Sequence, residues 1–152
     1  MTYRDILRDD LPAALEAEPR AIERLLTAIR PIVVRYCRAR LGSVDGSFAA
    51  ADDVAREICL AVLSSLPGYP DDGRPFLAFL HEIVVETLSR DAGDRAGAPL
   101  DSLPAIQRDI VILRTVVGLS TEETAEAVGM SPGGVRLAQH RALRRLRTTA
   151  GG

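Results

Sequence analysis

Apolar residues recur at helical spacing along most of this 152-residue chain. The firmest run starts at Ala21 and ends near Leu41, which predicts one long amphipathic helix. Its apolar stripe consists of Ile22, Leu25, Leu26, Ile29, Ile32, Val33, Tyr36 and Leu41. Pro31 either kinks this helix or begins its second half. Residues 1–20 show only weak periodicity and are interpreted as a leader with short helical stretches.

Two more apolar runs predict a second and a third helix. The second begins near Ala49 and ends at Leu66, with Asp52 and Asp53 in its first turns, where carboxylates suit the helix dipole. The third follows a turn-rich connector, residues 67–73, and is apolar on more than one face. Its apolar residues are Phe76, Leu77, Phe79, Leu80, Ile83, Val84 and Leu88. Together the three helices predict a bundle over residues 21–90.

A segment rich in Gly, Ala and Pro, residues 91–102, predicts a short linker to a second unit, residues 103–148. That unit opens with a helix from Leu103 to about Gly118, whose apolar positions are Ile106, Ile110, Leu113 and Val117. The predicted fold class is therefore all-α, with two small helical domains.

Two capped helices joined by a tight turn end the second unit. Ser120 and Glu123 form an S-x-x-E capping box that opens the first helix, and Gly129 stands where a left-handed residue ends it. Ser131 before Pro132 predicts that a second helix starts almost at once. The inward face of this last helix is expected to be Val135, Ala138, Ala142, Leu143 and Leu146. Such a pattern is typical of a helix-turn-helix.

The outward face of the last helix carries most of the positive charge of its half. Between Ser131 and Arg147 there are five Arg and no acidic residue. Guanidinium groups pair with phosphate oxygens or with the acceptor edge of guanine, and Gln and His reach base edges. The candidate DNA-binding residues are Ser131, Arg136, Gln139, His140, Arg141, Arg144 and Arg145. An ordinary amphipathic helix with a solvated Arg face is the alternative.

Composition and charge agree with a local nucleic-acid contact. The chain is 47% hydrophobic but only 4% aromatic, without Trp, which favours Ala-rich aliphatic helical cores. Residues 1–100 hold 12 Arg against 16 Asp and Glu, a net charge of −4, whereas residues 101–152 hold 7 against 5, a net charge of +2. A mildly acidic front and a basic back suit a protein that meets DNA through one end.

Little in the sequence indicates chemistry of another kind. Cys37 and Cys59 are isolated, without metal-ligand spacing, and are interpreted as small buried hydrophobes. No Gly-rich phosphate loop occurs, and His81 and His140 lie far apart, so we expect no cofactor, no metal and no enzymatic activity. The absence of a signal peptide or a long apolar run predicts a cytoplasmic protein.

The chain resembles bacterial sigma-70 factors of the extracytoplasmic-function group, in which a helical domain 2 and a helix-turn-helix domain 4 are joined by a linker. The match is widest in LPAIQRDIVILRTVVGLSTEETAEAVGMSPGGVRLAQHRALRRLR and continues in IRPIVVRYCRARLG, ADDVAREICLAVLSSLPGY and GRPFLAFL. It covers about residues 21–147. Within the group, the chain is most similar to the actinobacterial members that include sigma factor D.

The resemblance implies a surface for RNA polymerase. The ADDVAREI-type helix of the family docks on the clamp of the polymerase core, which by position implies contacts from Asp53, Arg56 and Glu57. Arg56 stands where the family commonly has Gln. On physics alone, a solvated helix face with pairing between neighbouring turns explains these charges equally well.

The resemblance also implies a surface for the −35 promoter element, with the last helix in the major groove. Contacts to bases or nearby phosphates are then expected from Arg136, His140 and Arg141, and contacts to the backbone from Gln139, Arg144 and Arg145. Leu137 stands where the family commonly has a polar residue, so the contact of this position with a base would be apolar or absent.

The third helix departs from the family pattern. Family members use it to hold the opened −10 element through basic and aromatic residues, but here it reads HEIVVETLSRDAGD. Its acidic residues are Glu82, Glu86, Asp91 and Asp94, against Arg90 and Arg95. The stacking platforms are limited to His81 and to Phe76 and Phe79, which are expected in the core. Such a helix repels a strand of phosphates more than it attracts one.

The linker is the second departure. About 12 free residues span at most roughly 40 Å, whereas the −10 and −35 elements lie on the order of 60 Å apart at ~3.4 Å per base pair. From the short linker and the opposite charges, we expect the two domains to pack on each other in the free chain and to bury the recognition helix.

The sequence thus predicts a transcription initiation factor that binds RNA polymerase core through domain 2 and a −35-like element through domain 4. A degenerate sigma-like regulator, which binds polymerase, DNA or an anti-sigma factor without opening promoters, is the first alternative. A stand-alone helix-turn-helix regulator is the second. The expected partners are RNA polymerase core, promoter DNA and an anti-sigma factor, without insertion into a membrane.

Overall fold

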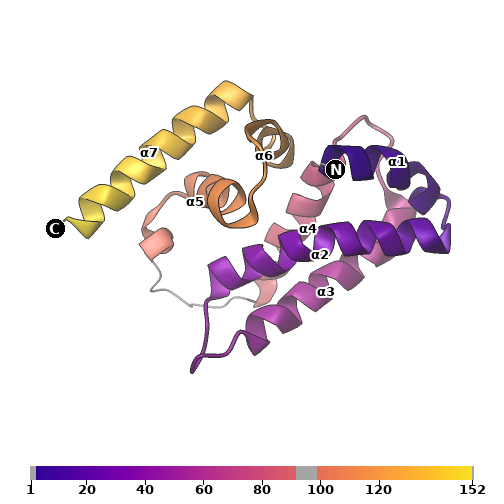
Figure 1. The fold of residues 1–152 in the computed structure, drawn as a ribbon, viewed down its shortest axis with the longest axis horizontal. Helices are drawn as coiled ribbons and strands as arrows, with labels where there is room; N and C mark the ends of the chain where they lie inside the picture. Colours follow the sequence, from indigo (N-terminus) through magenta and orange to yellow (C-terminus); the bar gives the residue numbers. More distant parts are fainter. Residues whose placement is uncertain (1–2, 92–98, 152) are drawn as a thin grey trace.

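The computed structural model describes residues 3–91 and 99–151, which form seven α-helices joined by short turns (Figure 1). The helices are α1 (Tyr3–Leu15), α2 (Pro19–Leu41), α3 (Ala49–Ser65), α4 (Phe76–Asp91), α5 (Ala105–Val111), α6 (Thr121–Val128) and α7 (Pro132–Ala150). Two 3₁₀ turns, η1 (Leu66–Gly68) and η2 (Pro99–Ser102), and a π-helix, η3 (Ile112–Val117), complete the order. The all-α prediction is confirmed.

The predicted linker, residues 91–102, is only partly within the described residues. Asp91 is the last residue of α4, and η2 already begins at Pro99. Its middle, residues 92–98, lies outside the described residues.

Helices α2, α3 and α4 form the front bundle because their predicted apolar stripes face one another. α2 and α3 lie side by side along most of their length (Figure 1). Leu25 and Ile29 of α2, Ile58 and Val62 of α3, and Leu88 of α4 are all almost completely buried. Close packing of aliphatic side chains therefore holds this bundle together, as the low aromatic content indicates.

The N-terminal leader is more ordered than its weak periodicity predicts. α1 covers most of it and packs on the bundle, with Ala14 buried and Leu7 and Leu11 half-buried against the same core. A 13-residue helix with Pro12 inside it is marginal by itself and gains its stability from tertiary contacts. Those contacts involve residues distant in sequence, so the local pattern underestimates the helix.

Pro31 lies inside α2 and does not begin a separate helix. α2 is one helix from Pro19 to Leu41, with proline instead at its first position. Pro31 is exposed, so the carbonyl that loses its usual N–H partner faces the solvent side of the bundle.

The predicted helix from Leu103 to Gly118 is divided in two. α5 gives way at Ile112 to the π-helix η3, and Gly118, with φ 89°, ends it in the left-handed region. The guanidinium of Arg114 donates a 2.6 Å hydrogen bond to the carbonyl oxygen of Leu119 and fastens this end. Ile106, expected on the apolar stripe, is 41% exposed, because it lies in the first turn of α5, ahead of the covered segment.

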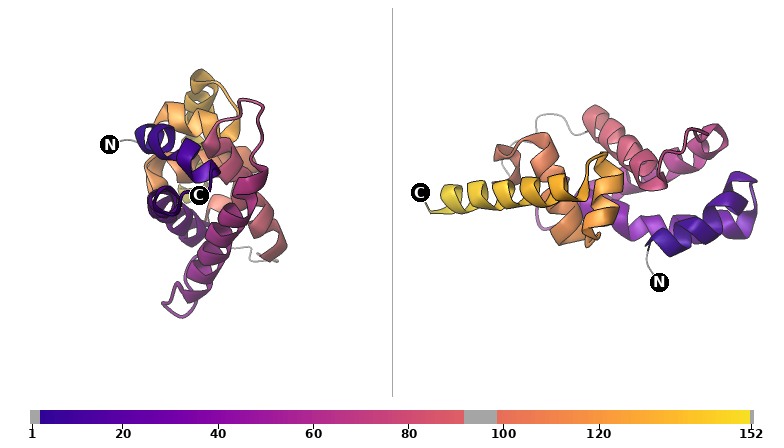
Figure 2. Two further views of the ribbon diagram at one scale, coloured as in Figure 1. Left: turned by 90° about the vertical axis from the view of Figure 1, so that its right-hand side faces the viewer. Right: turned by 90° about the horizontal axis from the view of Figure 1, so that it is seen from above.

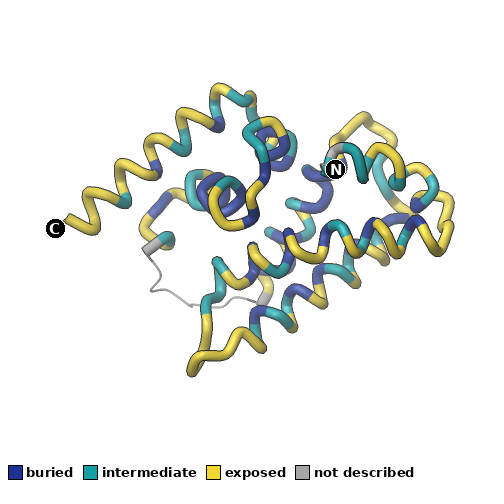
Figure 3. The backbone as a smooth tube through the Cα atoms, viewed as in Figure 1, coloured by how far each residue is buried: buried dark blue, intermediate teal, exposed yellow. Residues whose placement is uncertain are grey.

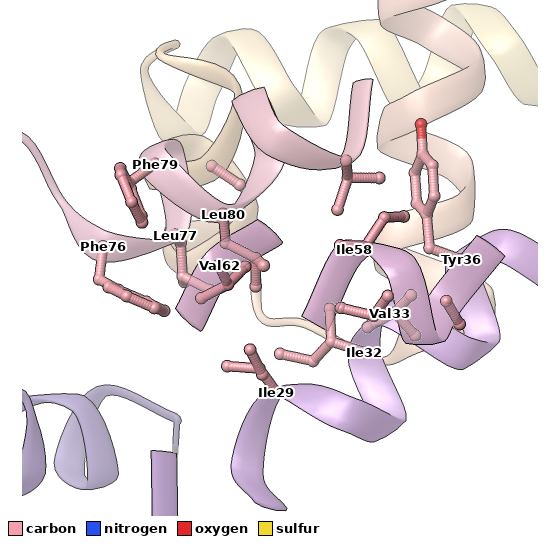
Figure 4. Close-up of a cluster of buried hydrophobic side chains, with 14 of the residues drawn as sticks. Ile29, Ile32, Val33, Tyr36, Ile58, Val62, Phe76, Leu77, Phe79 and Leu80 are labelled. Carbon is pink, nitrogen blue, oxygen red and sulfur yellow. The ribbon is translucent and has the colours of Figure 1, made fainter. Parts of the chain in front are cut away.

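One apolar core joins the front and back units. Ile112, Leu113, Val117 and Leu119 belong to the same buried cluster as the front bundle. η3 packs against α2, and α6 packs against α4. Figure 4 shows Tyr36 at the edge of the cluster, with its hydroxyl directed away from the apolar side chains. The prediction that the two units pack on each other in the free chain is confirmed.

Substitutions at two isoleucines of the back unit test the shared core. Ile112 is fully buried, so Ile112→Ala should lower the free energy of unfolding by about 2–5 kcal/mol. Ile106→Ala is the matched control at an exposed position and should change it by less than about 0.5 kcal/mol. Urea unfolding followed by circular dichroism measures both. Equal small effects from the two variants would contradict a core shared across the units.

Candidate nucleic-acid interface

The helix-turn-helix is built by the local caps that the sequence predicts. Ser120 and Glu123 form a reciprocal capping box: the Ser120 hydroxyl accepts from the Glu123 amide at 3.0 Å, and the Ser120 amide donates to the Glu123 carboxylate at 2.9 Å. Gly129 ends α6 in the left-handed region, with φ 72°. The Ser131 hydroxyl then accepts from the Gly134 amide at 3.0 Å and opens α7. These caps fix the residues at which α6 begins and ends and at which α7 begins.

α7 contacts the rest of the protein along a narrow stripe. Val135 and Ala142 are buried, and Ala138 and Leu146 are half-buried against α5 and α6. The prediction that Leu143 faces inward is wrong, since its side chain is 38% exposed. Most of the support for α7 comes from α5 and α6, so the covered stripe is narrower than the full apolar face expected from the periodicity.

The basic residues of α7 point into solvent. Arg136, His140, Arg141, Arg144, Arg145 and Arg147 are all exposed. Figure 3 shows α7 as an exposed helix with a few covered positions, and Figure 2 shows it extending away from the front bundle. The prediction that packing of the two units buries the recognition helix, which is α7, is wrong. The units meet through η3 and α6, which leaves α7 on the far side.

Two of the candidate DNA-binding residues already have structural partners. The Ser131 hydroxyl caps α7. Gln139 is half-buried, and its side-chain oxygen accepts from the Arg114 guanidinium at 3.3 Å. A guanidinium has no acceptor, so the amide oxygen of Gln139 faces Arg114 and its NH₂ group remains for other partners. Gln139 can therefore donate to a phosphate, but it is badly placed for a two-point contact with adenine.

A shallow hollow follows the basic face toward the C-terminal end of α7. Its volume is about 500 Å³, and it is lined by Ser102, Arg141, Arg144, Arg145, Thr148 and Thr149. Its three guanidinium groups are hydrogen-bond donors, which suits phosphate oxygens, whereas the Thr148 and Thr149 hydroxyls already donate to the carbonyl oxygens of Arg144 and Arg145. The groups in this hollow that can meet a DNA backbone are therefore the arginines already predicted from the sequence.

The three candidate polymerase-binding residues share one exposed side of α3. Asp53, Arg56 and Glu57 are all exposed, and Arg56 lies 3.3 Å from the carboxylate of Asp53. Leu60 and Leu63 continue this side of the helix at 58% and 36% exposure. Sequence reasoning missed both leucines, although Leu60 follows Glu57 by three residues and Leu63 follows Leu60 by three, a spacing that places neighbours on one helix face. The surface is thus charged at one end and apolar at the other.

A groove between α2 and α3 adjoins this surface. Its volume is about 430 Å³, and Leu26, Val34, Cys59, Leu60 and Leu63 supply its apolar lining. Arg38 at its edge makes two 2.8 Å hydrogen bonds to the Asp52 carboxylate and lies over the Phe48 ring. The Arg38 hydrogen bonds lower the pKa of Asp52 and keep it charged.

The exposed side of α4 is acidic, and its aromatic residues are buried. Phe76 and Phe79 are 4% and 8% exposed and pack with Tyr69, so their predicted place in the core is confirmed. Glu82 and Glu86 are exposed, and Arg74 lies 2.6 Å from the Glu82 carboxylate. Asp94 and Arg95, which also entered the expected charge balance, lie outside the described residues.

Asp109 of α5 forms a polar junction between the two units that the sequence did not reveal. Its carboxylate accepts a 2.6 Å hydrogen bond from the Tyr36 hydroxyl and a 3.2 Å hydrogen bond from Nε2 of His81. The guanidinium groups of Arg40 and Arg108 each approach it to 3.8 Å. Asp109 is only 6% exposed. The one signal in the sequence was an acidic residue directly before the buried run that starts at Ile110.

The junction keeps Asp109 charged despite its burial. Burial by itself raises the pKa of Asp109, but hydrogen bonds from His81 and Tyr36, with the nearby charges of His81 and Arg108, outweigh it and lower the pKa. Burial and the neighbouring Asp109 carboxylate together raise the pKa of the Tyr36 hydroxyl, which stays a donor. The Nε2 atom of His81 must carry hydrogen, because the carboxylate can only accept.

The cysteines are shielded from ionisation. Burial raises the pKa of Cys37 to about 12 and also raises that of Cys59, so both thiols stay protonated at neutral pH. Among residues 3–91 and 99–151, no group of three His, Cys, Asp or Glu side chains is arranged to hold a metal ion. Within the same ranges, no helix is long and apolar enough to cross a bilayer.

The Asp109 junction predicts a pH-dependent contribution to stability. Asp109→Asn should lower the free energy of unfolding at pH 7 by roughly 1–3 kcal/mol, because a buried ionic acceptor is lost. The folded-state pKa lies below the ordinary value of 3.8, so the carboxylate stabilises the fold above that pH and loses this effect as the pH falls through the lowered pKa.

Urea unfolding between pH 7 and pH 2.5 measures this contribution. The difference between the native chain and Asp109→Asn should shrink below pH 3.8. Asp71→Asn, on an exposed connector, is the control and should show no such change. A difference that stays constant down to the lowest pH would contradict the role given to Asp109.

Both units match models of one protein family. The model of "Sigma-70 region 2" matches residues 25–96, and the model of "Sigma-70, region 4" matches residues 98–146. The two matches cover the front bundle and the helix-turn-helix unit in the order expected from the sequence.

Individual sigma factors are similar over most of the chain. It is 48% identical over 167 residues to the ECF RNA polymerase sigma factor SigD of Mycobacterium tuberculosis, covering 88% of this chain and 79% of that protein. It is 39% identical over 174 residues to the ECF RNA polymerase sigma factor ShbA of Streptomyces griseus, covering 90% and 91%. CnrH, solved in complex with the cytosolic domain of CnrY, shares the fold, with a TM-score of 0.75 at 23% identity over 96% of this chain and 97% of that one.

Proposed function

Because the chain belongs to the extracytoplasmic-function group of sigma-70 factors, we propose that residues 21–90 dock on RNA polymerase core and that residues 103–148 read a −35-like element. The observation that carries this proposal is the exposed basic face of α7 on a fully capped helix-turn-helix. Polymerase performs the chemistry, so the chain itself needs no cofactor and is no enzyme. Its place of action is the cytoplasm, where polymerase and promoter meet.

The DNA-binding roles divide along α7. Arg136, His140 and Arg141 contact bases or the phosphates beside them, since they lie on the N-terminal half of the helix, which enters the major groove. Arg144 and Arg145 hold the backbone through the hollow described above. Gln139 donates to a phosphate through its NH₂ group, and Ser131 contributes by capping the helix.

The polymerase-docking role falls to the exposed side of α3. Asp53, Arg56 and Glu57 provide the charged part of this surface, and Leu60 and Leu63 provide its apolar part. At protein interfaces, charged residues commonly steer the partner into place and apolar residues add affinity when they are buried, and this surface offers both.

The closed arrangement has to open for a −10 and a −35 element to be bound at once. α6 packs on α4, the helix that holds the opened strand in the family. CnrH has a similar fold and was solved with the cytosolic domain of CnrY. By analogy, an anti-sigma factor that favours the closed form is a partner of this chain.

A degenerate sigma-like regulator is the second candidate, and one observation favours it. The exposed residues of α4 include Glu82 and Glu86, whereas Phe76 and Phe79 are buried and His81 is engaged by Asp109. An acidic helix without free aromatic rings holds a single strand poorly.

Binding to RNA polymerase core followed by abortive transcription on a promoter library separates the candidates. Binding with transcription is the expected result. Binding without transcription would replace the proposal by the degenerate regulator. Specific duplex binding without any affinity for polymerase would instead identify a stand-alone helix-turn-helix regulator.

The roles on α7 predict two different mutational effects. Arg136→Ala should weaken binding of the polymerase complex to its preferred duplex by about 1–3 kcal/mol and relax the sequence preference at one position. Arg145→Ala should weaken binding to all duplexes alike and reduce the salt dependence by about one phosphate contact. Fluorescence anisotropy over a salt series measures both. A sequence-independent loss in Arg136→Ala would remove that residue from base recognition.

The docking surface predicts a loss of polymerase affinity on charge reversal. Glu57→Arg should weaken binding to polymerase core about tenfold. It places a second positive charge beside Arg56 and removes one of the negative charges that the surface presents to its partner. Asp71→Arg makes the same change of charge on the exposed connector and should leave the affinity unaltered. Surface-capture binding assays with purified core compare the two. Equal affinities for both variants would exclude this side of α3 as the contact.

A further inference from the structure

Leu137 is an exposed apolar side chain in the middle of the basic face of α7. It is 50% exposed, and Arg136, His140 and Arg141 beside it are exposed as well. It belongs to none of the apolar clusters formed by residues 3–91 and 99–151. Leu137 therefore adds nothing to the described core, and its apolar surface is available to a ligand.

The turn in front of Leu137 is open at Gly133. In an α-helix each side chain leans toward the N-terminus and lies over the turn before it. For Leu137 that turn contains Gly133 and Gly134, which carry no side chains. A Cβ atom on Gly133 would meet nothing within 4 Å, so a ligand can approach the helix closely there, whereas Gly134 is covered by the side chains of Met130 and Ser131. Leu137 also lies in the first two turns of α7, the part of a recognition helix that contacts base edges.

We infer that Leu137 reads a thymine in the −35-like element through the C5-methyl group of that base. Among the four bases, thymine alone presents a methyl group in the major groove, and a leucine has no donor or acceptor with which to read the others. The surrounding guanidinium groups favour polyanionic DNA as the occupant of this face, because no acidic residue occurs between Ser131 and Arg147. The inference rests on the proposed DNA-binding function and adds a base preference to it.

Leu143 provides a matched control on the same helix. It is the other exposed leucine of α7, at 38%. At ~100° per residue it lies roughly 120° around the helix axis from Leu137, and it is about 9 Å farther along the axis toward the C-terminus, beyond the first two turns that contact base edges. Leu143→Ala removes the same apolar volume without touching the proposed thymine contact.

The test begins with the complete chain bound to polymerase core, which selects its preferred −35 sequence from randomised duplexes. Each thymine of the selected sequence is then replaced, one at a time, by deoxyuridine, which lacks only the methyl group. We expect one replacement to weaken binding roughly fourfold, the size expected for one buried methyl group. That penalty should vanish in Leu137→Ala and persist in Leu143→Ala.

The following outcomes would overturn the inference. A selected sequence without thymine, or a deoxyuridine penalty that persists in Leu137→Ala, would exclude a methyl contact by this residue. Leu137→Ala that weakens binding to polymerase core, and not to DNA, would assign Leu137 to a protein interface. Failure to select any duplex would overturn the proposed promoter function itself. Selection that depends on Arg136 but lacks a methyl effect would overturn this inference alone.

Discussion

The buried carboxylate of Asp109 constrains how the two halves of this protein meet. A charge removed from water needs hydrogen-bond donors, and Asp109 finds them in Tyr36 of α2 and His81 of α4. Because these donors come from two different helices of the front bundle, satisfying both restricts how α5 can lie on that bundle. The apolar residues that follow, Ile112 and Leu113, then enter the front core. Burial of these apolar residues stabilises the contact between the units, and the hydrogen bonds of Asp109 restrict how the units are oriented relative to each other.

This placement decides which surfaces the closed chain presents. η3 and α6 lie against α2 and α4, so α7 projects from the far side with its guanidinium groups in solvent. The side of α3 that carries Asp53 and Glu57 is exposed as well. The strand-holding helix of the family, α4, is instead packed against α6. The packing of the two units therefore covers part of α4, while the surfaces proposed for the −35 element and for polymerase stay accessible.

The acidic exposed residues of α4 and the basic face of α7 place opposite charges on the two units. Glu82 and Glu86 belong to the front unit, whereas the arginines of α7 belong to the back unit. Opening costs the burial of Ile112, Leu113, Val117 and Leu119. The free energy of binding to polymerase and promoter DNA has to exceed this cost before the two promoter elements are held together.

The sequence by itself determined the helices, their caps and the identity of the basic face, because these depend on residues that are neighbours along the chain. The capping box of Ser120 and Glu123 is an example: each partner is within one turn of the other. Only the tertiary structure decided that α1 forms a helix packed on the front bundle, that Leu143 and most of α7 are exposed, and which residues bind Asp109. Tyr36 and His81 lie far from Asp109 in sequence, so no periodicity could pair them. Long-range contacts form only where packing of whole helices brings such residues together, and that packing is a property of the assembled fold.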